Sequence, residues 1–233
     1  MIPTPVSVLA KGQWVKRNGE AIDAAKEMDW SEMGFDPLKL DWDLTMDDMQ
    51  FSMPFGIKME NSVITKPYSI SIDVSAEELS SKHDECFFML IDRHGKWRIN
   101  TMLKGFATNL QGLASSFSNT GDIILIGKSK QDMIAAFNRM KELGGGIVAC
   151  ENGVPVKKIP LRLQGIMSSH PVTELMAEEK KLLEYLKEKG YKFADPIYSL
   201  LFFSSTHLPY IRITQEGIYD VMKKTVLFPT IMR

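Results

Sequence analysis

The chain gathers hydroxyl and amide side chains in the stretch LKGFATNLQGLASSFSNTGDIILIG, which runs from Leu103 to Gly127. Ser115, Ser116 and Asn119 lie shortly before the apolar run IILIG, so they could donate hydrogen bonds to a polar ligand at the end of a buried strand. Serine and asparagine in loops also commonly bond to their own backbone. A nucleophilic serine would need an activating base, and no G-x-S-x-G turn is present. The sequence therefore leaves a ligand role and a structural role open.

The glycine triplet Gly144–Gly146 is the second feature that could do chemistry, as a cradle for phosphate. A phosphate loop precedes a helix, so that the free N–H groups of the first turn meet the anion. Here the triplet follows a predicted helix and enters a predicted strand, which is the reverse order. We interpret it as a helix cap that lets helix and sheet pack closely.

Metal-binding and thiol chemistry have no recognisable pattern. The histidines are scattered, without H-x-H, H-E-x-x-H or a paired C-x-x-C, and Asp92-Arg93 is expected to be a solvated turn. Cys86 and Cys150 each lie in an apolar run, so we expect two buried thiols in a reducing compartment rather than a disulfide. The four histidines are His83, His94, His170 and His207.

Composition excludes several classes of partner. The formal net charge of the 233-residue chain is -1, so no global field draws it to nucleic acid or to an anionic membrane. No apolar run approaches the ~20 residues that span a bilayer, and the N-terminus lacks the features of a signal peptide. We therefore expect a cytoplasmic protein that binds neither nucleic acid nor membrane.

The elements that must position these residues follow from the periodicity. Residues 6–22 predict short antiparallel strands between Lys-Gly and Asn-Gly turns. Residues 23–48 are acidic, with nine Asp and Glu against two Lys, and carry two tryptophans, so we expect a linker that packs on a surface. From Phe51 onward, pairs of strands alternate with a few helices. This order predicts an α+β fold of antiparallel and mixed sheets with a few packed helices.

From Phe51 onward, individual helices and strands can be predicted with their residue ranges. Apolar residues at Met133, Ala136, Phe137, Met140 and Leu143 predict an amphipathic helix that Gly144 ends. We also predict strand pairs on both sides of Glu60-Asn61 and of Arg93–Lys96, a single strand over 123–127 and a hairpin that turns at Asn152-Gly153. A helix is predicted from Pro171 to Gly190, followed by a tail of one helical turn and one strand. Residues 105–119 are expected to be a crossover loop.

Four motifs in combination resemble one family. Lys104-Gly105-Phe106, the GLASS run of 112–116, NRMKELGGGIV at 138–148 and PLRLQGIMS at 160–168 are similar to the C-terminal domain of bacterial adenine deaminases, in the amidohydrolase superfamily. The resemblance covers roughly residues 50–220. It implies that 1–22 are returning strands of the amidohydrolase β-sandwich, 23–50 a linker, and 51–233 the adenine-deaminase C-terminal α+β domain.

The resemblance also implies a function. The parent protein is expected to deaminate adenine hydrolytically to hypoxanthine and ammonia with a divalent metal, manganese or iron, held by a barrel domain outside this chain. This chain alone is expected to bind no metal, to contain no catalytic residue and to be inactive, with the barrel and other copies of itself as partners. Ser115, Ser116, Asn119 and Lys104 are the candidates for a substrate-facing loop.

One segment departs from the family pattern. Many relatives continue the ASS motif with His-Asp-Ser-His-Asn, whereas this chain has Phe117-Ser118-Asn119-Thr120-Gly121. The substrate of the parent protein is therefore open between adenine and a different cyclic amine or amide. A non-catalytic interaction or ligand-binding module is the alternative from another class.

Overall fold

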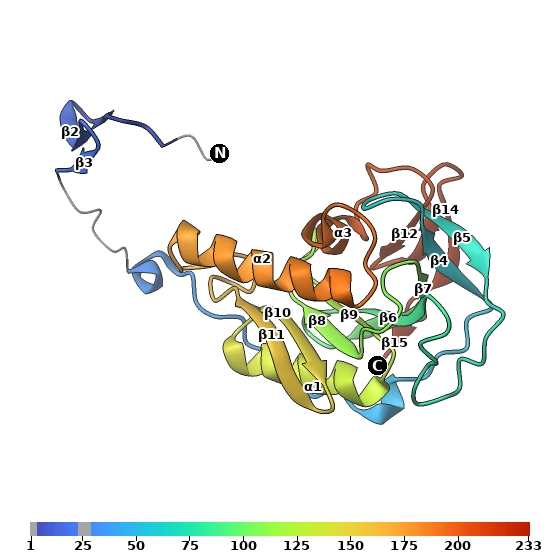
Figure 1. The fold of residues 1–233 in the computed structure, drawn as a ribbon. Coiled ribbons are helices and arrows are strands. Elements are labelled where there is room, and N and C mark those ends of the chain that lie inside the picture. Colours follow the sequence, from blue (N-terminus) through green and yellow to red (C-terminus); the bar gives the residue numbers. More distant parts are fainter. Residues whose placement is uncertain (1–3, 23–28) are drawn as a thin grey trace. The chain divides into compact units, whose positions relative to one another are not determined.

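The computed structural model describes residues 4–22 and 29–233, in two compact units that divide between Gly34 and Phe35 (Figure 1). The smaller unit contains a three-stranded antiparallel sheet, as predicted, followed by a short 3-10 helix. The first part of the predicted acidic linker, residues 23–28, lies outside the described residues. The elements of this unit are β1 (Val8–Ala10), β2 (Gln13–Arg17), β3 (Glu20–Ala21) and η1 (Trp30–Met33).

The larger unit is built on a nine-stranded sheet with the order β11-β10-β8-β9-β6-β7-β4-β5, in which β15 also pairs with β7. All neighbours are antiparallel except β4 and β7, which are parallel. The strands are β4 (Phe55–Met59), β5 (Thr65–Ser69), β6 (Glu85–Ile91), β7 (Trp97–Lys104), β8 (Gly112–Ser115), β9 (Ile123–Gly127), β10 (Gly146–Glu151), β11 (Val154–Pro160) and β15 (Ile231–Met232).

Helices and a second sheet cover both faces of this sheet (Figure 1). The helix α1 packs on one face, and α2, α3 and the three-stranded sheet β12-β13-β14 pack on the other. The predicted α+β class is confirmed. The remaining elements are η2 (Met46–Asp48), α1 (Lys130–Leu143), α2 (Val172–Glu188), α3 (Pro196–Phe202), β12 (Ile211–Thr214), β13 (Gly217–Asp220) and β14 (Thr225–Pro229).

Strand β6 shows why the sheet has two cores. Its run ECFFMLI is buried at every position, because side chains alternate between the faces and both faces are covered. Phe88 and Leu90 belong to the core under α2 and α3, whereas Phe87 and Met89 belong to the core under α1. A continuous apolar run is therefore what this strand requires.

Helix α1 forms as its periodicity predicts. All five apolar positions of the predicted stripe are buried, and the Ser129 hydroxyl caps the first turn by accepting from the N–H of Asp132 at 3.1 Å. Gly144 ends the helix in the left-handed conformation with φ of 76°. The glycine triplet thus is the predicted helix cap.

The predicted crossover loop over 105–119 is wrong in its centre, because β8 runs through it from Gly112 to Ser115. The backbone of α1 lies directly on this strand. A Cβ at Gly112 would lie 2.2 Å from the carbonyl carbon of Asp132, and a Cβ at Gly127 would lie 2.2 Å from the carbonyl oxygen of Gln111. Close packing therefore requires glycine at Gly112 in front of the IILIG strand and at Gly127 at its end.

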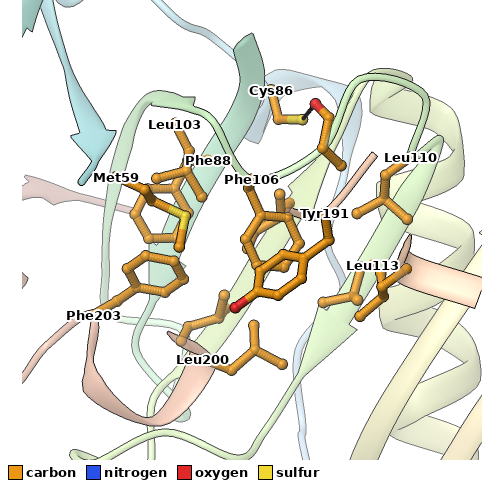
Figure 2. Close-up of a cluster of buried hydrophobic side chains, with 14 of the residues drawn as sticks. Met59, Cys86, Phe88, Leu103, Phe106, Leu110, Leu113, Tyr191, Leu200 and Phe203 are labelled. Carbon is orange, nitrogen blue, oxygen red and sulfur yellow. Dashed lines mark hydrogen bonds between the residues drawn. The ribbon is translucent and has the colours of Figure 1, made fainter. Parts of the chain in front are cut away.

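The Lys-Gly-Phe motif also has a structural explanation. Gly105 adopts φ of 89°, and the next residue, Phe106, is fully buried. Figure 2 shows its ring beside that of Tyr191 in the core, and the two ring centroids are 5.3 Å apart. The turn thus inserts an aromatic side chain between β7 and the segment that follows α2.

Residues 35–50 of the predicted linker pack on the larger unit. Leu40, Leu44 and Met49 are buried in the core under α1. The ring of Trp42 lies 4.7 Å from that of Phe137, centroid to centroid, and its Nε1 donates to the carbonyl of Arg93 at 2.9 Å. This part of the linker behaves as expected for an acidic segment that carries a large aromatic residue.

The C-terminal tail contains more strands than predicted. After α3 it forms β12, β13 and β14, and then β15 pairs with the start of β7. Arg233 follows β15 and binds Asp48 with two hydrogen bonds, from Nε at 2.7 Å and from Nη2 at 2.8 Å. The prediction of a single strand was wrong because these strands are too short to show a period.

Candidate functional site

Ser115 and Ser116 lie at the end of β8 and are fully buried. The Ser115 hydroxyl stays within its own turn, where it accepts from the N–H of Phe117 at 3.1 Å and donates to the Phe117 carbonyl at 3.2 Å. This is the structural role that serine commonly takes at a strand end. Within the described chain, neither hydroxyl is at the surface.

Ser116 joins two backbone segments. Its hydroxyl accepts from the N–H of Gly146 at 2.8 Å and donates to the carbonyl of Gly165 at 2.5 Å. The approach is close, because a Cβ at Gly145 would lie 2.4 Å from the Cα of Gly165. The turn Gln164–Gly165, with φ of 55° and 80°, is therefore held against the start of β10.

Lys104 lies at the opposite end of the sheet. It pairs with Glu85 at the start of β6, whereas Ser115 pairs with Ile124, whose other neighbour is Leu90 near the end of β6. Five residues of strand separate the two rows, which is about 17 Å. The Lys104 ammonium binds Glu85 at 2.9 Å. The four predicted residues therefore do not form one site within this chain, and their substrate-facing role stays a prediction.

Asn119 is exposed, and its segment borders two cavities. Phe117 lines an apolar cavity of about 420 Å³ together with Ile159, Ile166 and Leu175. Asn119 and its neighbour Thr120 line a second cavity, of about 600 Å³. The segment 117–121 thus contributes to two cavities, with Phe117 in one and Asn119 in the other.

Asp92 and Asp122 are a buried acidic pair that the sequence did not suggest. Both side chains are less than one-tenth exposed, at 7% each, so the expectation of a solvated turn at Asp92 was wrong. Burial raises the pKa of Asp122, and the negative charge of Asp92 raises it further. Asp92 accepts from the N–H of Lys96 at 3.0 Å. The only sequence signal is that each aspartate directly adjoins a buried strand.

Residues 4–22 and 29–233 contain both cysteines and all four histidines. In these ranges no group of three or more His, Cys, Asp or Glu side chains could hold a metal ion. Cys86 and Cys150 are free and buried, as predicted, and burial raises the pKa of their thiols to about 12 and about 11. Both thiols are therefore protonated at neutral pH and are poor nucleophiles.

Among the described residues, no helix combines the length and the hydropathy needed to cross a bilayer.

Comparison with known proteins identifies the family. Residues 62–225 match the model of the adenine deaminase C-terminal domain. The chain is 61% identical to a protein of Halalkalibacterium halodurans named "Putative adenine deaminase" and 58% identical to one of Bacillus subtilis, and each match covers 99% of this chain. A protein of Roseobacter denitrificans named "Adenine deaminase" is 25% identical over 92% of the chain.

These relatives are much longer than the chain. The matches cover 40% of the Halalkalibacterium and Bacillus proteins and 38% of the Roseobacter protein. The family match extends over most of the larger structural unit, including the motifs around Phe106, Ser116 and Gly146. The chain therefore belongs to the family of adenine deaminase C-terminal domains.

Proposed function

We propose that this chain is the C-terminal part of a hydrolase that removes the 6-amino group of adenine and releases hypoxanthine and ammonia. The observation that carries the proposal is the family match over residues 62–225, together with long relatives named adenine deaminase. The remainder of the protein, which we infer to be an amidohydrolase barrel, would supply the reaction centre. We further propose that the protein acts in purine metabolism in the cytoplasm.

The expected divalent metal, manganese or iron, does not fit the side chains of residues 4–22 and 29–233. No described cluster of His, Cys, Asp and Glu offers three ligands. Three or four such ligands are the usual minimum for a catalytic transition-metal site. We therefore place the metal in the remainder of the protein and derive no step of the reaction from residues of this chain.

This chain would contribute a rigid wall beside the reaction centre. The Ser116 hydroxyl fixes the turn Gln164–Gly165, and the Arg93 guanidinium donates to the carbonyl of Gln164 at 3.2 Å. Among the four candidates Lys104, Ser115, Ser116 and Asn119, Asn119 alone is exposed. Asn119 can thus touch a neighbouring domain directly, whereas Ser115 and Ser116 act by positioning backbone.

The test compares the full-length protein with the 233-residue chain. Both are purified, loaded with manganese and assayed for ammonia and hypoxanthine from adenine. We expect turnover by the full-length protein only. Turnover by the chain alone would overturn the location of the reaction centre. Ammonia release from another cyclic amine or amide, without release from adenine, would overturn the substrate.

A further inference from the structure

Helix α2 carries two apolar sets of residues with the same spacing, and only the second set is buried. The sets are Val172, Leu175 and Met176, and then Leu182, Tyr185 and Leu186. The second set enters the core under α2 and α3, whereas none of residues 172–181 is buried. Ten residues are roughly 80° short of three helical turns, so the two sets face different sides of the helix.

The first set borders the apolar cavity of about 420 Å³. Leu175 lines this cavity, and Val172 and Met176 are its neighbours on the same side of the helix. The other walls come from the 117–121 segment, β10, β11, residues 161–168 and the start of α3. Of the ten residues that line the cavity, eight are apolar and only Ser168 and Glu179 are polar.

Exposed apolar side chains surround this cavity. On α2, Val172 is 69% exposed and Met176 43%. Met167, which lines the cavity, is 44% exposed, and Tyr198, which follows the lining residue Ile197, is 54% exposed. Single apolar residues are common on protein surfaces, but a cluster around an apolar cavity indicates a contact surface. We call the cavity and these four exposed residues the α2 patch.

The chain enters the larger unit beside the α2 patch. The larger unit begins at Phe35, and the carbonyl of Asp36 accepts from the N–H of Gln164 at 3.0 Å. Gln164 leads directly into residues 166–168, which line the cavity. Any part of the full-length protein that precedes this chain is therefore connected to the larger unit at this point. Linkage makes the encounter of the two parts intramolecular, so an apolar surface of modest size is sufficient for docking.

We propose that the α2 patch binds an apolar segment of the part of the full-length protein that precedes this chain. The relatives offer an occupant of sufficient size, because the matched region is only 40% of the Halalkalibacterium and Bacillus proteins. Phe117 lines the cavity and Asn119 is exposed two residues later, so the docking surface continues into the segment predicted to face the reaction centre. The inference rests on the proposed function, which places the remainder of the protein beside that segment.

Methionine oxidation tests the docking. Met167 and Met176 belong to the α2 patch, whereas Met222, which is 67% exposed, lies between β13 and β14 and does not line the cavity. The full-length protein and the 233-residue chain are treated with dilute hydrogen peroxide, and the sulfoxide at each methionine is measured by mass spectrometry of peptides. We expect Met167 and Met176 to be oxidised roughly fivefold more slowly in the full-length protein than in the chain, and Met222 equally fast in both.

Two matched variants of the full-length protein locate the docking surface. Met176→Asp places a charge in the α2 patch and should restore fast oxidation of Met167, because an unpaired charge opposes burial under an apolar segment. Ala177→Asp is the control, since Ala177 is exposed on the same helix, about 100° around its axis from Met176. This control should leave Met167 protected. Both positions are exposed, so α2 should tolerate both changes.

Equal oxidation of Met167 and Met176 in both proteins would overturn the proposal, as would equal effects of the two variants. Protection that appears in the 233-residue chain as its concentration rises would also overturn it, because the occupant would then be a second copy. The oxidation measurement needs no substrate, so it is separable from the proposed function. Adenine turnover by a full-length protein whose Met167 stays reactive would contradict the docking alone, and protection without turnover would contradict the proposed function alone.

Discussion

At the scale of single residues, Ser116 shows how a motif can be recognised without its role being visible. The sequence marks a cluster of hydroxyls in front of a buried strand. It does not show that the hydroxyl bridges Gly146 and Gly165, because that contact joins segments 30 and 49 residues away. The buried pair Asp92 and Asp122 was not predicted from the sequence for the same reason. Burial of a polar side chain depends on what packs over it.

Ser116→Ala is expected to destabilise the chain by about 1–3 kcal/mol. The substitution leaves the buried N–H of Gly146 without its side-chain acceptor and the buried carbonyl of Gly165 without its donor. Urea unfolding followed by circular dichroism measures the loss. Ser81→Ala is the control, because Ser81 is exposed. An unfolding free energy equal to that of the wild type would contradict the bridging role.

The same variant tests the predicted active-site role in the full-length protein. If Ser116 orders the wall beside the reaction centre, Ser116→Ala should lower kcat/KM for adenine at a temperature where the protein stays folded. Asn119→Ala tests direct contact, since Asn119 is exposed at this edge. An unchanged kcat/KM in both variants would exclude the predicted role of this loop.

At the scale of elements, strong local sequence signals were sufficient to predict a helix and a hairpin. Helix α1 was predicted from its apolar stripe and glycine cap, and the β10–β11 hairpin from Asn152-Gly153, which adopt φ of 51° and 74°. Strand β8 was missed because Gly-Leu-Ala-Ser has low strand propensity and is only four residues long. The segment forms a strand because it pairs with β9 and β10 on its two sides and α1 packs against it.

Gly112→Ala tests this account of β8. The new Cβ would lie 2.2 Å from the Asp132 carbonyl carbon, so α1 would have to move, at a cost of about 1–3 kcal/mol or more. Gly153→Ala is the matched control. No atom lies within 4 Å of its Cβ position, and only its φ of 74° opposes the change, so about 1 kcal/mol is expected. Equal losses in thermal unfolding would contradict close packing as the cause.

At the scale of the whole larger unit, Asp48 joins the packed linker to the end of the chain. Its carboxylate accepts two hydrogen bonds from Arg233 and one from the N–H of Thr45 at 3.0 Å, and Arg98 lies 3.6 Å away. Burial alone would raise the pKa of Asp48, but these bonds and charges outweigh it and hold the pKa below its ordinary value.

This ion pair predicts a loss of stability in acid. The pKa of Asp48 is lower in the folded state than in the unfolded state. The ionised carboxylate therefore contributes its full stabilisation of the folded state at pH values above its unfolded pKa of about 4. It is lost as the pH falls through the lower folded value. Asp48→Asn should therefore cost roughly 3 kcal/mol at pH 7.

The measurement is thermal unfolding of wild type and variant over a series of pH values. The difference between them should shrink steadily below about pH 4. Asp47→Asn is the control, since Asp47 is exposed and adjacent in sequence. A difference that stays constant through the acid range would show that the Asp48 carboxylate is not held in its charged form by Arg233.

The segment 117–121 has a consequence for protein engineering. Phe117 and Asn119 are two residues apart, yet each lines a different cavity. Replacing the whole segment 117–121 would therefore remodel both compartments at once, and any gain or loss of activity could not be traced to either. Exchanging Phe117 and Asn119 separately would keep the two effects apart.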